Sequence, residues 1–142
     1  MNKSTYNKIQ KYLYNYNNID KIINNIKLDT TDYTHYSYNN WIKSKYNLGI
    51  TLEDDIIDIQ NNRIILRLQK WKSVISDTLE YYKKFDNIKY QYICLKYFDK
   101  KSYEKIQNKL KLNKRQQKDM QVDILQHIFL YSVRKKLLRK NY

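Results

Sequence analysis

The sequence contains no proline and only one glycine, Gly49. Proline and glycine interrupt helices more strongly than other residues, so long helices meet no such breaker over most of the chain. A sheet with tight hairpin turns would need more residues that adopt positive φ. These absences favour an all-α protein.

The single cysteine, Cys94, excludes a disulfide within the chain and fits a reducing compartment. No stretch of about 18 apolar residues is present that could span a membrane. The N-terminal residues hold no apolar run of the kind found in signal peptides. We therefore expect a cytoplasmic protein without a membrane partner.

Acidic residues are scarce in the C-terminal part of the chain. The 142 residues carry a net charge of +14. Residues 88–142 hold 15 Lys and Arg against 4 Asp and Glu, whereas residues 1–87 hold 13 against 10. An AT-rich genome would raise the lysine content everywhere, so it explains the total better than the asymmetry. The basic C-terminal part predicts a polyanionic partner there.

Apolar residues recur at steps of three and four along most of the chain, which predicts amphipathic helices. Ser4 or Thr5 is expected to cap the first helix, and Asp86-Asn87 to separate the second from the third. In the second helix the stripe is clearest from Ile64 to Tyr82, and in the third it runs from Ile88 to Phe98. The predicted helices are Ser4–Leu28, Thr51–Phe85, Ile88–Phe98, Ser102–Leu110 and Lys114 to about Lys140.

Residues 29–50 show no helical period and are predicted to form a loop. The aromatic residues of this loop are suited either to stacking on the bases of a single-stranded nucleic acid or to packing on neighbouring helices, and the second is favoured. They are Tyr33, Tyr36, Tyr38 and Trp41. The expected organisation is one compact helical bundle, in which residues 1–87 form a helical N-terminal part with this loop and residues 88–142 form a basic C-terminal part.

The segment SYEKIQNKLKLNKRQQKDM, residues 102–120, is the most informative about function. Ser102 is expected to cap a short helix that buries Tyr103, Ile106 and Leu110, and Asn113 to cap the next helix after a three-residue turn. A short helix, a tight turn and a second helix form the helix-turn-helix layout, whose second helix enters the major groove of DNA. Three positions depart from the usual motif. Gln107 replaces a small residue, Lys111 replaces the turn glycine, and Gln117 replaces an apolar residue early in the second helix.

The side of the second helix opposite its apolar stripe is predicted to face DNA. Arg115 and Lys118 suit guanine, and Gln121 suits adenine. Asp119 either accepts from a cytosine amino group or is merely exposed. The candidate base-reading residues are Lys114, Arg115, Lys118, Asp119, Gln121 and Val122. The candidate phosphate contacts are Lys101, Ser102, Tyr103, Lys105 and Asn113. The basic residues from Arg134 to Lys140 either add phosphate contacts or simply suit a helix C-terminus.

With those residues in view, the chain resembles phage late transcription regulators of the RinA and ArpU type. The resemblance runs from Ile64 to Leu138, and it rests on WKSVISDTLEYYKKF, YICLKYFDKKSYEKIQNKLKLNKRQQ and the aliphatic C-terminal helix. It implies a helix-turn-helix like region four of bacterial sigma factors, control of late phage genes in a bacterial host cell, and RNA polymerase as a partner.

Nothing in the sequence predicts an enzyme or a cofactor. A single glycine excludes a glycine-rich phosphate loop. His35 and His127 have no companions at metal-ligand spacing, and His127 is expected to pack at the edge of the core. Four acids lie close together in the sequence: Glu53, Asp54, Asp55 and Asp58. They point in different directions around one helix, which disfavours a shared metal.

Two alternatives to a transcription regulator stay open. A small subunit of a phage terminase would also use a helix-turn-helix on DNA, with the N-terminal helices building a ring. A helical module that binds an acidic protein would not use DNA at all. The apolar stripes of the first two long helices are suited to pairing within one chain or across a homodimer.

Overall fold

A computed structural model describes residues 2–31 and 51–139, and the described part contains helices and no strand. The described part of the chain is therefore all-α, as the sequence predicts. Of residues 28–31 and 51–60 only the helical backbone is described. The aromatic cluster of residues 33–41 lies outside the described residues, and so do the side chains of the acids at positions 53–58.

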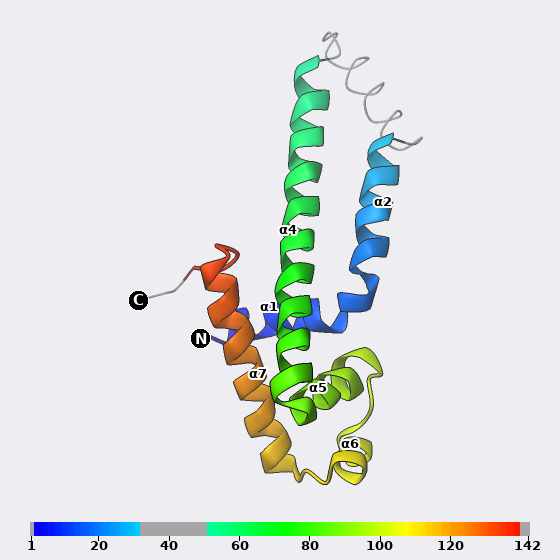
Figure 1. Cartoon of the computed structure of the whole chain (residues 1–142). Helices are drawn as coiled ribbons and strands as arrows, with labels where there is room; N and C mark the ends of the chain where they lie inside the picture. Colours follow the sequence, from blue (N-terminus) through cyan, green and yellow to red (C-terminus); the bar gives the residue numbers. More distant parts are fainter. Residues whose placement is uncertain (1, 32–50, 140–142) are drawn as a thin grey trace. The chain divides into compact units, whose positions relative to one another are not determined.

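The described residues group into two compact units (Figure 1). The first comprises Met1–Asn17 and Lys70–Tyr142, and the second comprises Asn18–Gln69. The sequence boundary between residues 87 and 88 marks a change in charge, and both of its sides contribute to the first unit. In the second unit, Ile19, Ile23 and Ile65 are buried.

The predicted N-terminal helix is interrupted, and its second part continues to Thr31, so the prediction that the loop begins at residue 29 is wrong. Instead of one helix over Ser4–Leu28, the chain forms α1 (Lys3–Tyr14), a 3-10 turn (Tyr16–Asn18) and α2 (Ile19–Thr31). Asn15 ends α1, and its side-chain amide donates to the Lys11 carbonyl. Asparagine competes for backbone partners in this way, which explains the break within an otherwise apolar period. Asn2, and not Ser4 or Thr5, caps α1 by accepting from the Thr5 N–H.

Three of the remaining helices begin and end within one residue of the predicted positions. They are α4 (Thr51–Phe85), α5 (Asn87–Ile93) with its π-helical continuation η2 (Cys94–Phe98), and α6 (Tyr103–Leu110). Asp86 caps α5 as expected, accepting from the Lys89 N–H. The last helix, α7 (Lys114–Arg134), is shorter than expected. Lys136 has a φ of 60°, so the basic tail is not a continuation of the helix.

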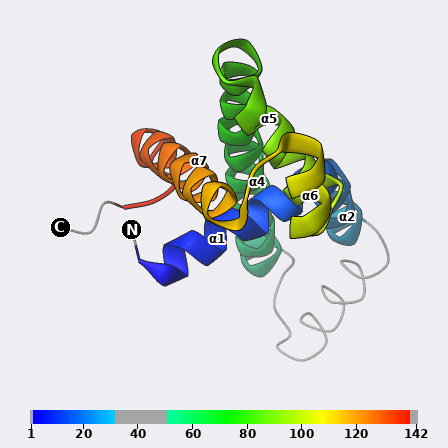
Figure 2. The same cartoon turned by 90° about the horizontal axis from the view of Figure 1, so that it is seen from below.

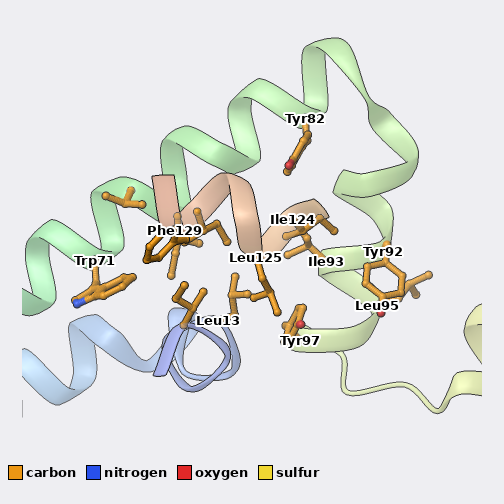
Figure 3. Close-up of a cluster of buried hydrophobic side chains, with 14 of the residues drawn as sticks. Leu13, Trp71, Tyr82, Tyr92, Ile93, Leu95, Tyr97, Ile124, Leu125 and Phe129 are labelled. Carbon is orange, nitrogen blue, oxygen red and sulfur yellow. The ribbon is translucent and has the colours of Figure 1, made fainter. Parts of the chain in front are cut away.

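The core of the first unit is built from α1, α4, α5, η2 and α7, and Ile106 of α6 is also buried in it. Helix α1 lies against α7 (Figure 2). Figure 3 shows side chains from these elements converging, with Leu13 of α1, Trp71 of α4 and Leu125 of α7 fully buried. Most of the predicted inward stripe is confirmed, but Ile64 and Ile88 are about half exposed. Their neighbour Ile65 and the pair Ile93 and Tyr97 are buried instead, because the helical faces are rotated from the predicted ones.

Candidate nucleic-acid interface at the α6–α7 corner

Helices α6 and α7 are separate, and the chain changes direction in the three residues between them (Figure 1). Lys111 adopts the left-handed conformation, with φ 58° and ψ 37°, and its N–H donates to the Gln107 carbonyl. It therefore has the backbone geometry that glycine usually supplies at a helix end. Asn113 caps α7 in a reciprocal box with Gln116, at 2.8 and 2.9 Å. These local bonds define the α6–α7 corner, residues 102–122.

Gln117 fastens this corner from inside. Its side chain is only 5% exposed, and its amide donates to the Tyr103 carbonyl at 3.2 Å and to the Leu112 carbonyl at 3.1 Å. In the sequence, Gln117 stands where the motif usually has an apolar residue. Spacing alone does not reveal that two backbone carbonyls at this place need a donor. The glutamine thus joins the start of α6, the turn and α7.

The exposed face of α7 includes three of the candidate base-reading residues. Arg115 and Asp119 are exposed, and Val122 is 44% exposed. Neither charged side chain forms an ion pair with a described residue, whereas Lys89 pairs with Asp86 and Asp123 outside the corner. Arg115 is therefore available to an external partner.

The other three candidates, Lys114, Lys118 and Gln121, line a pocket of about 290 Å³ between η2, α6 and α7. The two lysines are exposed at its mouth. Gln121 is partly buried, and its amide donates to the Tyr97 hydroxyl at 3.3 Å. The structure therefore brings the lysines to the predicted surface, but Gln121 already has a partner within the protein.

The candidate phosphate contacts gather at the start of α6 and of α7. Lys101, Ser102, Tyr103 and Lys105 are exposed, and the Ser102 hydroxyl accepts from the Lys105 N–H as a cap. The prediction that Tyr103 is buried is wrong: it is 38% exposed and lines the pocket, because the carbonyl of this residue, and not its ring, is held against α7. Asn113 is exposed as the cap of α7.

Lys96 is a member of this surface that sequence reasoning missed. It lies in the π-helical turn, lines the pocket, and places its Nζ 5.7 Å from the ring centroids of both Tyr92 and Tyr97. Burial lowers the pKa of Lys96. A lysine inside the apolar run YICLKYF was the available signal, but the helical period assigned that run wholly to the core.

The comparisons add no relative. No family model, curated protein or solved structure matches the chain. Within residues 2–31 and 51–139 as described, no group of three metal-ligating side chains comes together, and no helix is long and apolar enough to cross a membrane.

Proposed function

We propose that the chain binds double-stranded DNA through the α6–α7 corner and acts as a sequence-specific transcription regulator. The observation that carries the proposal is the corner itself. A fastened turn presents the first turns of α7, with Arg115 and Lys118 exposed and without ion-pair partners among the described residues. A short helix followed by such a turn is the helix-turn-helix layout, in which the N-terminal residues of the second helix read base edges.

Four exposed side chains of α7 suit base edges in the major groove. Arg115 and Lys118 would donate to the guanine O6 and N7 acceptors, and Asp119 would accept from a cytosine amino group. Val122 would make an apolar contact with a thymine methyl group. Because Gln121 is bonded to Tyr97, it would first have to release that hydroxyl to read adenine.

Phosphate contacts would fix the register of α7 in the groove. Lys101, Lys105 and the Tyr103 hydroxyl are exposed at the start of α6. Ser102 and Asn113 accept backbone hydrogen bonds with their side-chain oxygens, and each keeps a donor, a hydroxyl or an amide, for a phosphate oxygen. We propose a binding role rather than a catalytic one for this set.

The resemblance to phage regulators extends the proposal to the biological setting. In that setting the chain is phage or prophage encoded, acts in the cytoplasm of the bacterial host, controls late genes, and works with RNA polymerase. A homodimer would place two corners on a two-fold related site, since half-site spacing mirrors the symmetry of the protein.

Selection of bound sequences from a random duplex library tests the proposal. The wild type should enrich one motif. Arg115→Ala should lose discrimination at one base pair, by about 1–3 kcal/mol for a bidentate contact, while Arg63→Ala, an exposed arginine of the second unit, should enrich the wild-type motif. Equal binding to all sequences by the wild type would contradict sequence-specific recognition.

A further inference from the structure

The pocket between η2, α6 and α7 concentrates positive charge. Four lysines line it: Lys96 from η2, Lys101 before α6, and Lys114 and Lys118 from α7. No carboxylate is among its lining residues, and none of the four forms an ion pair with a described residue. Four ammonium groups around one hollow repel one another, and an anion in the hollow would offset that repulsion.

Lys96 is the innermost of the four by burial. Its side chain is partly buried, and its amine lies near two tyrosine rings, whose faces attract a cation only weakly. A partly buried ammonium without a counter-ion is costly, and its lowered pKa expresses that cost. A bound anion would remove this cost. A fully solvated lysine on a convex surface carries no such cost and would gain little from an anion.

We propose that this lysine pocket is a binding site for a phosphate group. A phosphate group offers several oxygens to separate donors, which suits the point charges of lysines arranged around a hollow. The volume of about 290 Å³ lies at the small end of ligand pockets, which fits a phosphate with an attached sugar. Tyr92 and Tyr103 line the same hollow.

The phosphate has two possible sources. It belongs either to the backbone of a duplex, which deepens the proposed function and in that case rests on it, or to a free phosphorylated molecule that would compete with DNA for Lys114 and Lys118. The two sources share one chemistry at the pocket, so the experiment uses one probe for each.

Nuclear magnetic resonance of the lysine side chains gives a direct readout at Lys96. Inorganic phosphate is titrated at constant ionic strength against sodium chloride, and a short random duplex is titrated separately. Binding of phosphate in the pocket should shift the Lys96 Cε signals until they saturate and should raise the pKa of Lys96. A shift with the duplex assigns the site to the DNA backbone, and a shift with inorganic phosphate alone assigns it to a free ligand.

A charge-matched pair of double variants separates the pocket from general electrostatics. Lys101→Gln with Lys118→Gln removes two exposed lysines of the pocket, and Lys70→Gln with Lys84→Gln removes two exposed lysines outside both the pocket and the corner. The first double variant should weaken the phosphate affinity measured from the Lys96 signals roughly tenfold or more, because hydrogen bonds to charged groups contribute on that order. The control should change it little.

Lys96 signals that respond to neither probe, or equally weak binding by both double variants, would overturn the phosphate site. Fluorescence anisotropy of the duplex, measured in parallel, keeps the two proposals apart. Duplex binding without any response at Lys96 leaves the DNA-binding function standing and removes this inference. A response to inorganic phosphate without duplex binding does the reverse.

Discussion

At the scale of single residues, Lys111 shows how the corner departs from the usual composition while keeping the usual geometry. Its φ of 58° lies in the left-handed region, where a side chain crowds the following carbonyl and glycine does not. The chain therefore accepts a strained lysine at the end of α6. The N–H of Lys111 still bonds to the Gln107 carbonyl, so the strain is held by the helix end.

Replacing Lys111 with glycine should relieve this strain. We expect Lys111→Gly to raise the free energy of unfolding by about 1 kcal/mol, since the left-handed conformation costs a non-glycine residue on that order. Lys109→Gly, inside α6, should instead lower it by about 1 kcal/mol, because glycine is a poor helix residue. Urea unfolding of both variants measures the difference, and destabilisation by Lys111→Gly would contradict the strained assignment.

His127 predicts a dependence of stability on pH. Its ring lies 5.2 Å from the Tyr81 ring and 5.1 Å from the Tyr82 ring, and desolvation by burial, then Lys89 and Arg134, lower its pKa from 6.5. Because the folded protein favours the neutral imidazole, the contribution of His127 to the free energy of unfolding is complete above pH 6.5 and is lost as the pH falls through the lowered pKa.

Chemical unfolding between pH 7.5 and pH 5 tests the contribution of His127. The free energy of unfolding of the wild type should fall more steeply with decreasing pH than that of His127→Phe, which keeps a ring against the two tyrosines. Identical pH profiles for the two proteins would show that His127 titrates alike in the folded and unfolded states.

At the scale of elements, the attachment of α6 to α7 depends on one side chain. The Gln117 amide serves two backbone carbonyls, and both would lose this donor without it. We expect Gln117→Ala to lower the free energy of unfolding by about 1–3 kcal/mol, the usual cost of unsatisfied buried groups, and to weaken DNA binding. Gln126→Ala, at an exposed position of the same helix, should leave both nearly unchanged. Wild-type stability in Gln117→Ala would show that the corner holds without it.

The helices themselves follow from apolar periodicity, which predicts α4, α5, α6 and the start of α7 well. Periodicity does not report local competition for backbone groups, so it misses the break at Asn15 between α1 and α2. It also assigns faces with an error of about one position, which is why Ile88 is exposed and Ile93 is buried. The corner and Arg115 were predictable from spacing and charge. Lys96 was not, because its place depends on the π-helical turn and on the helices around it.

At the scale of the whole molecule, the positive charge of residues 88–142 should dominate the affinity for DNA. Lysines that neutralise phosphates release counter-ions, so the binding constant should fall steeply as salt rises. Lys101→Gln should weaken binding evenly across sequences and reduce the slope of log K against log salt by about 1. Lys21→Gln, an exposed lysine of the second unit, should leave that slope unchanged. Equal slopes for all three proteins would place the contacts elsewhere.

The central claim is that the α6–α7 corner, residues 102–122, is the surface that contacts a duplex. The most direct measurement is a titration of isotope-labelled protein with the selected duplex, following every backbone amide by nuclear magnetic resonance. The account predicts that the largest shifts fall at residues 101–105 and 113–122, with little change over residues 61–85. No binding, or shifts confined to residues outside the corner, would contradict it.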